Sequence, residues 1–201
     1  MSHISVNFLV VGDTGVGKSS IIASFFGEKI QPIHLPTHVL SASHCTFAFS
    51  SKEVEAYICD LPGSEHFRPI VSCFYPGAAA ILLVFDLINK HTFNNLPRWM
   101  HDIRETLPAH SVVVLIGNKS DLEKARVVSR AEAQIFADRF HLRYFEVSAA
   151  LGLNVGLAFD VAAGLVLDKV EERDGATSEE DKAVSSCDMG EEERLIWKKL
   201  M

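Results

Sequence analysis

Short runs of apolar residues alternate with longer, partly polar segments along most of this chain. The longest uninterrupted run, residues 78–85, is typical of a strand that is covered on both faces, and residues 112–116 form a second buried run. Residues 92–107 have instead the amphipathic pattern of a surface helix. The pattern predicts six strands, at residues 4–11, 46–49, 54–60, 78–86, 112–116 and 144–147.

Helices are predicted between these strands, at residues 20–26, 65–74, 92–107, 129–140 and 154–170. The first should end near Gly27, and Pro97 fits the third only near its first turn or at a kink. The fourth opens with a capping box, in which Ser129 is the N-cap and Glu132 follows three residues later. Strands that alternate with helices predict an α/β fold, with a mainly parallel six-stranded sheet and helices on both of its faces.

Two segments depart from this alternation. Residues 31–44 contain two prolines and three histidines without a clear period, and we expect a loop that runs into an edge strand. Residues 171–189 are rich in Asp, Glu, Ser, Gly and Thr, which is typical of a solvated linker. The chain is therefore expected to form one domain at residues 1–170 and a flexible acidic tail at residues 171–201. The end of this tail is either a short helix or a frayed segment.

The composition excludes several classes of protein. With a net charge of −7 and an isoelectric point of about 5.7, the chain lacks the basic face of a general nucleic-acid binder. Its four cysteines show neither a C-x-x-C pair nor zinc-like spacing, which favours a reduced, cytoplasmic protein. No apolar run is long enough to span a bilayer, and the N-terminus lacks the layout of a signal peptide.

A glycine-rich stretch lies between the first predicted strand and the first predicted helix. It matches the pattern G-x-x-x-x-G-K-S in full, and so predicts a loop whose backbone N–H groups bind phosphate. The lysine is placed to reach the outer phosphates and the serine to bind Mg²⁺; the alternative is a glycine turn that binds nothing. The residues predicted to bind nucleotide here are Gly12, Asp13, Thr14, Gly15, Val16, Gly17, Lys18, Ser19 and Ser20.

A second motif, Asp-Leu-Pro-Gly at residues 60–63, follows the end of the third predicted strand. The carboxylate of Asp60 is placed to hold a water molecule of the Mg²⁺ shell. The N–H of Gly63 is placed to meet a terminal phosphate without a side-chain clash. Many junctions between a strand and a turn have this pattern, so its weight comes from the phosphate-binding loop that precedes it.

A third motif, Asn-Lys-Ser-Asp at residues 118–121, predicts the choice of base. The carboxylate of Asp121 can accept two hydrogen bonds from guanine, and adenine has no such pair of donors. This disfavours the alternatives of an ATP-using P-loop kinase and of an ordinary turn. Asn118 and Lys119 would brace the loop and cover the ring, and the N–H of Ala149 could contact guanine O6. The residues predicted to surround the base are Asn118, Lys119, Asp121, Leu122, Ser148 and Ala149.

Together these motifs resemble those of the small GTPases of the Ras superfamily, over residues 5–170, and they look most like the Rab branch. The resemblance implies a P-loop NTPase fold that binds GTP or GDP with Mg²⁺. It also implies that Thr37 binds Mg²⁺ and senses the γ-phosphate. Effectors, exchange factors and GTPase-activating proteins would bind at residues 31–44 and 63–76. Regulation of vesicle transport is implied by the resemblance alone.

Some residues depart from the family's pattern. Ser64 stands where the family has the glutamine that orients the attacking water, so intrinsic GTP hydrolysis should be slow unless an activating protein supplies a glutamine. Ile30 replaces the aromatic residue that covers the edge of guanine. The catalytic candidates are Lys18, Thr37, Gly63 and Ser64, and the metal candidates are Ser19, Thr37 and, through water, Asp60.

These departures leave two hypotheses. The protein is either a switch that cycles between GDP and GTP, or a GTP-locked scaffold that barely hydrolyses its nucleotide. The last four residues contain no cysteine, so a prenyl anchor is not supported, although peripheral membrane association stays open. Cys187, in the predicted tail, is either a plain surface thiol or a palmitoylation site.

Overall fold

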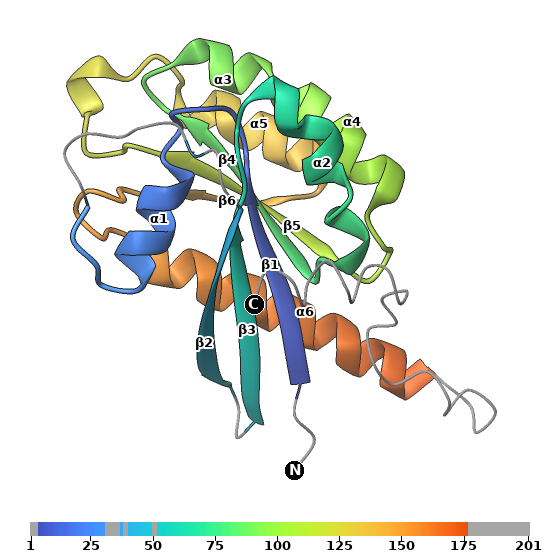
Figure 1. The fold of residues 1–201 in the computed structure, drawn as a ribbon. Coiled ribbons are helices and arrows are strands. Elements are labelled where there is room, and N and C mark those ends of the chain that lie inside the picture. Colours follow the sequence, from blue (N-terminus) through green and yellow to red (C-terminus); the bar gives the residue numbers. More distant parts are fainter. Residues whose placement is uncertain (1–3, 31–36, 38–39, 50–51, 177–201) are drawn as a thin grey trace.

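The computed structural model describes residues 4–30, 37, 40–49 and 52–176. In this part of the chain a sheet of six strands lies at the centre, in the order β2-β3-β1-β4-β5-β6 (Figure 1). Here β2 pairs antiparallel with β3, and the other neighbouring strands run parallel. The strands are β1 (Ile4–Val11), β2 (Ser41–Phe49), β3 (Lys52–Asp60), β4 (Ala80–Asp86), β5 (Val112–Asn118) and β6 (Arg143–Glu146).

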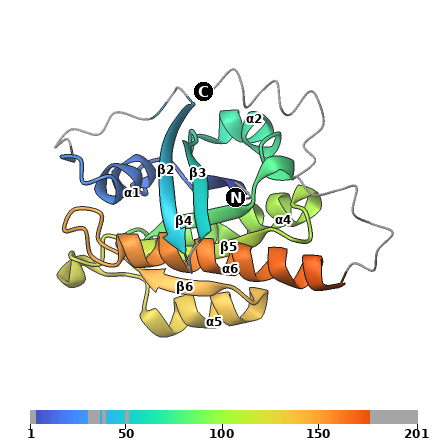
Figure 2. The same cartoon turned by 90° about the horizontal axis from the view of Figure 1, so that it is seen from below.

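Helices cover both faces of this sheet, which confirms the predicted α/β fold (Figures 1 and 2). One apolar core lies between the sheet and helices α1 and α6, and a second lies between the sheet and helices α2 to α5. The helices are α1 (Lys18–Phe25), α2 (Arg68–Ser72), α3 (Lys90–Asn94), α4 (Leu96–Thr106), α5 (Arg130–Phe140) and α6 (Val155–Ala176). Shorter 3₁₀ turns are η1 (Glu65–Phe67), η2 (Tyr75–Gly77) and η3 (Glu123–Ala125).

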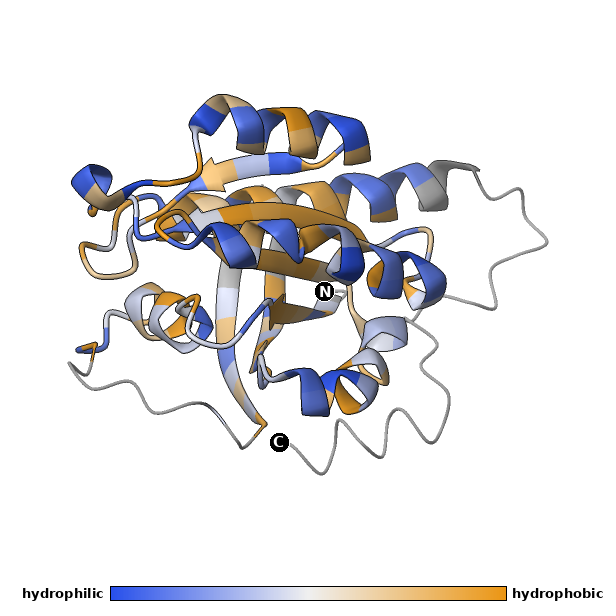
Figure 3. Cartoon of the chain, turned by 90° about the horizontal axis from the view of Figure 1, so that it is seen from above, coloured by the Kyte–Doolittle hydropathy of each residue, from blue (hydrophilic) through white to orange (hydrophobic). Residues whose placement is uncertain are grey.

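The side chains of β1 show why the central strands are apolar throughout. Phe8 and Val10 lie in the core beneath α1 and α6, whereas Leu9 and Val11 lie in the core beneath α2 to α5. All four side chains are buried, and full burial of each stabilises the fold by about 1.5–3 kcal/mol. The helices, which each cover one face, show apolar and polar stripes instead (Figure 3).

The edge strand β2 begins earlier than its sequence predicts. Residues 41–44 were expected to lie in a loop, but Ser41 lies opposite Asp60 and pairing continues to the far end of β3. An edge strand needs one paired neighbour, and its open side tolerates polar residues. The composition of residues 41–44 therefore does not reveal their pairing. The preceding residues 31–36 and 38–39 lie outside the described residues.

The predicted helix at residues 92–107 is wrong as a single element, because the structure has α3 and α4 separated at Asn95. Pro97 lies in the first turn of α4, where its missing N–H is tolerated. A helix running through this point from α3 would need that N–H, so two short helices form in its place. The side chain of Asn89 caps α3 by accepting a hydrogen bond from the N–H of His91, at 3.1 Å.

Two other helix ends differ from expectation. Ser129 caps α5 as predicted, accepting from the N–H of Glu132 at 3.2 Å, but the carboxylate of Glu132 pairs with Lys90 of α3. The capping box is therefore only half formed. Helix α6 continues to Ala176, past the predicted end at residue 170. Residues 177–201 lie outside the described residues, and the predicted tail, with Cys187 and its terminal segment, stays a prediction. No helix in the described ranges is both long and apolar enough to cross a membrane.

Candidate functional site

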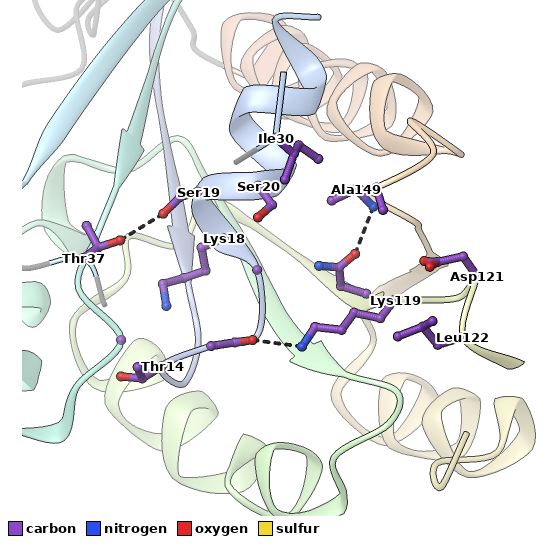
Figure 4. A pocket seen from close by; sticks show the side chains of 15 residues that line it. Thr14, Lys18, Ser19, Ser20, Ile30, Thr37, Lys119, Asp121, Leu122 and Ala149 are labelled. Carbon is purple, nitrogen blue, oxygen red and sulfur yellow. Dashed lines mark hydrogen bonds between the residues drawn. The ribbon is translucent and has the colours of Figure 1, made fainter. Parts of the chain in front are cut away.

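A cavity of about 280 Å³ lies at the edge of the sheet where β1 and β5 end (Figure 4). Because parallel strands end at the same edge, the loops that follow β1, β3, β5 and β6 meet there. Most of the predicted site residues are brought together around this cavity. It is lined by Thr14, Gly15, Gly17, Lys18, Ser19, Ser20, Ile30, Thr37, Gly63, Asn118, Lys119, Asp121, Leu122, Ala149 and Ala150.

The glycine loop after β1 depends on backbone conformations that other residues rarely adopt. Gly12, Gly15 and Gly17 have φ angles of 140°, 79° and 94°. Helix α1 begins at once, with Gly17 as its N-cap and no side chain among the described residues capping its first N–H groups. The loop and the helix start therefore present backbone donors and a positive helix end toward the cavity, as an anion site requires.

Lys18 lies at the centre of this loop and is buried, with its side chain bent back over the turn. Its Nζ donates hydrogen bonds to the carbonyl oxygens of Gly12 and Asp13, both at 2.9 Å. Burial lowers the pKa of the Lys18 amino group to about 8, while the carboxylates of Asp60 and Asp13 act in the opposite direction. A buried amino group held by neutral carbonyls, and lining the cavity, is well placed to bind a phosphate oxygen.

Three oxygen-bearing side chains lie together beside Lys18. The hydroxyls of Ser19 and Thr37 are 2.9 Å apart (Figure 4). Asp60 is buried, and its Oδ1 has no hydrogen-bond partner among the described residues. Burial raises the pKa of the Asp60 carboxyl, while a hydrogen bond with Ser19 and the charge of Lys18 oppose this rise.

An orphaned carboxylate oxygen next to two hydroxyls fits a hard divalent cation such as Mg²⁺, which prefers oxygen ligands. Mg²⁺ usually keeps several waters and takes only one or two protein carboxylates, with substrate phosphates completing its shell. The residues present therefore fit the predicted Mg²⁺ site, which would need phosphate oxygens to complete it.

Gly63 lines the cavity, whereas the next residue, Ser64, is not among the described residues that line it. A Cβ atom at position 63 would overlap Lys18 Nζ and lie 2.6 Å from the backbone of Asp13, so only glycine fits here. The backbone of residue 63 thus adjoins the phosphate-binding loop. Ser64 is not among the described residues that line the cavity, and its Oγ lies 3.4 Å from Nδ1 of His66. The structure therefore leaves the proposed catalytic serine outside the cavity.

The base-reading loop after β5 is tied to two other loops. Asn118 Nδ2 donates to the carbonyl of Val16 at 2.9 Å, and Asn118 Oδ1 accepts from the N–H of Ala149 at 3.1 Å. Lys119 Nζ donates to the carbonyl of Gly15 at 3.1 Å (Figure 4). It also donates to Asp86 Oδ2 at 2.6 Å. The predicted bracing by these two side chains is observed. The N–H of Ala149, predicted to contact guanine O6, already has Asn118 as a partner.

The carboxylate of Asp121 accepts a hydrogen bond from the side chain of Ser148, on the loop after β6. Ser148 is fully buried, is not among the described residues that line the cavity, and donates to Asp121 Oδ1 at 2.5 Å. Its predicted contact with nucleotide stays a prediction. Ser148 also accepts from the N–H of Leu151 at 3.1 Å. The hydrogen bond from Ser148 orients the carboxylate of Asp121, which lines the cavity. Leu122 and Ile30 also line the cavity.

Sequence reasoning also missed the ion pair between Asp86 and Lys119. Asp86 follows a run of apolar residues at the end of β4, and only 6% of its side chain is exposed. A charged residue at the end of an apolar run can be recognised in the sequence. It indicates an ion pair, because a buried charge requires a partner. The partner itself is 33 residues away and cannot be read from the local pattern.

The glycine loop connects the central parallel strand β1 to helix α1, in a sheet that helices cover on both faces. This arrangement defines the class of P-loop NTPases. Within this class, the model of the Ras family matches residues 7–168 of the chain. The chain therefore belongs to the Ras family. Members of this family are GTP-binding molecular switches, are generally GTPases, and bind GTP or GDP, typically with Mg²⁺.

Proposed function

We propose that the protein is a Rab-like switch that cycles between GDP and GTP, hydrolyses GTP slowly and regulates intracellular vesicle transport. The observation that carries the switch is the cavity itself, which gathers the phosphate loop, Thr37, Gly63 and the base-reading loop. The Rab branch and vesicle transport rest on the likeness of the sequence motifs. Effectors, exchange factors and activating proteins would bind at residues 31–44 and 63–76, and the protein would act in the cytoplasm.

In this proposal each part of the cavity has one task. Lys18 and the loop N–H groups bind phosphates, Asp121 reads guanine, and Asn118, Lys119 and Leu122 hold the base in place. Ser19 and Thr37 would bind Mg²⁺ directly and Asp60 through water; the cation would neutralise phosphate charge. Gly63 and Thr37 would meet the γ-phosphate and so order the two partner-binding segments only in the GTP state.

Slow hydrolysis follows from Ser64. Orientation of the attacking water is a main part of catalysis in this class, and a serine side chain is too short to reach both the water and the phosphate. The position of Ser64 outside the cavity lining supports this proposal, because its Oγ lies beside the exposed His66.

We expect Ser64→Gln to raise the single-turnover rate of GTP hydrolysis by about tenfold or more, because the longer amide can orient the water. The measurement is phosphate release from GTP-loaded protein. Glu65→Gln is the matched control, since it places the same amide one position further along an exposed segment. A wild-type rate already equal to that of Ser64→Gln would contradict the proposed role of this position.

The alternative function is a GTP-locked scaffold that acts as a binding module. It is favoured by the same Ser64, which stands where the family has the glutamine that orients the attacking water. The two functions separate when the wild-type protein is assayed with and without a Rab GTPase-activating protein that supplies a glutamine. Acceleration supports the cycling switch, and persistent GTP under both conditions supports the scaffold.

A further inference from the structure

Asp13, in the phosphate-binding loop, directs its carboxylate away from the cavity and toward helix α4. Trp99 Nε1 donates to Asp13 Oδ1 at 2.8 Å, and Asn95 Nδ2 donates to Asp13 Oδ2 at 2.7 Å. Each carboxylate oxygen therefore has its own donor. The side chain of Asp13 is 17% exposed, so these bonds to a charged group are largely shielded from water.

Trp99 connects this carboxylate to the segment that follows Gly63. Its indole is buried, and the guanidinium of Arg68 lies over the ring at 4.3 Å from the centroid. Arg68 is the first residue of α2, is itself buried, and forms an ion pair with Asp102 of α4 at 3.0 Å. A desolvated cation on an indole face is a favourable contact, so α2 is attached to α4 at the same residue that holds Asp13.

The backbone of Asp13 has two further neighbours that belong to the site. Its carbonyl accepts a hydrogen bond from Lys18 Nζ, and its C and O atoms lie 2.6 Å from the position that a Cβ of residue 63 would take. Asp13, which α4 holds through its side chain, therefore also holds Lys18 through its carbonyl. It also borders Gly63, the residue proposed to sense the γ-phosphate. A change in the position of α2 can reach the loop through Arg68 and Trp99.

We propose that Asp13 and Trp99 are positioning residues that hold the phosphate loop in its nucleotide-binding shape. Through Arg68 they make nucleotide release depend on the position of α2. This inference rests on the guanine-nucleotide binding proposed above. It assigns to the side chain of Asp13 a role in holding the loop, besides the nucleotide binding predicted for this residue.

The test is the dissociation rate of fluorescent mant-GDP from Trp99→Phe, which keeps an aromatic ring but loses the N–H donor. Loss of one hydrogen bond to a charged group corresponds to about tenfold faster release. Asn95→Ala removes the second donor at a half-buried position and should give a similar change. Asp13→Ala combined with Trp99→Phe should release mant-GDP no faster than Asp13→Ala alone, because both changes remove the same bond.

Met100→Leu is the matched control, because Met100 is a buried neighbour on α4 whose thioether offers no N–H donor. Arg68→Gln should speed release of a non-hydrolysable mant-GTP analogue about threefold more than release of mant-GDP, since Gly63 is engaged only in the GTP state. Wild-type release rates in Trp99→Phe and Asn95→Ala, with only a lowered melting temperature, would overturn the positioning role. Release of both nucleotides at the wild-type rate in Arg68→Gln would overturn the link to α2. Failure of the wild-type protein to bind mant-GDP at all would instead refute the proposed function.

Discussion

Replacing Asp121 by asparagine is expected to weaken GTP binding by about a thousandfold or more and to shift the preference toward xanthine nucleotides. A carboxylate accepts hydrogen bonds from N1–H and from the 2-amino group of guanine, whereas an amide can satisfy only one of these donors. Xanthine carries an oxygen in place of that amino group, which the asparagine amide can meet as a donor. Loss of paired groups in a buried site is what gives discrimination of this size. Competition of GTP and XTP against mant-GDP measures both affinities.

The neighbouring Ser120→Ala is the matched control. The hydroxyl of Ser120 is buried and has no hydrogen-bond partner among the described residues, so its removal should leave GTP affinity unchanged. Ser148 would still hold the asparagine in place, because its hydroxyl can bond to an amide as it does to a carboxylate. An Asp121→Asn protein with wild-type affinity for GTP would show that this residue does not read the base.

Gly12→Ala is expected to destabilise the fold by about 3–5 kcal/mol, or to prevent folding. The residue has a φ of 140°, and a Cβ there would overlap the carbonyl oxygen of Val84 and lie 3.1 Å from its carbonyl carbon. These atoms belong to the central strand β4, which is paired on both sides and cannot move aside. Backbone strain and overlap with fixed atoms add together, which places the change among the largest single-residue effects. Urea unfolding in saturating GDP measures the loss.

Gly156→Ala provides the comparison, because this glycine lies in α6 and its Cβ would meet no described atom within 4 Å. The same substitution there should stabilise the protein by about 0.5–1 kcal/mol, since alanine loses less backbone entropy in a helix. If Gly12→Ala unfolded at the same urea concentration as the wild type, the close packing of the loop against β4 would be incorrect.

The fold could be read from the sequence where a local pattern determines it. The central strands are buried on both faces, so each is an apolar run, and the helices between them carry their own start and stop residues. The exact start of β2 could not be read, because pairing with β3 rather than side-chain type decides it. The break at Asn95 was missed because the predicted helix was amphipathic across it.

The site residues also divide into those that a local sequence pattern predicts and those that it does not. The glycine loop and the base-reading loop are continuous in sequence, so the chemistry of their residues could be predicted together. Thr37 was found only through the family resemblance. The hydrogen bonds of Asn95 and Trp99 to Asp13 join residues 82 and 86 positions apart, and no periodicity reports such a contact. The supporting role of Ser148 behind Asp121 depended likewise on the folded arrangement.

The identity of the nucleotide that copurifies with the full chain tests the central proposal most directly. The protein would be denatured after purification in Mg²⁺, and the released nucleotide identified and quantified by ion-exchange chromatography. A site that binds phosphates through Lys18 and reads guanine through Asp121 predicts about one GDP or GTP per chain, with little adenine nucleotide. An adenine nucleotide in that amount, or none together with no binding of added GTP, would contradict the account.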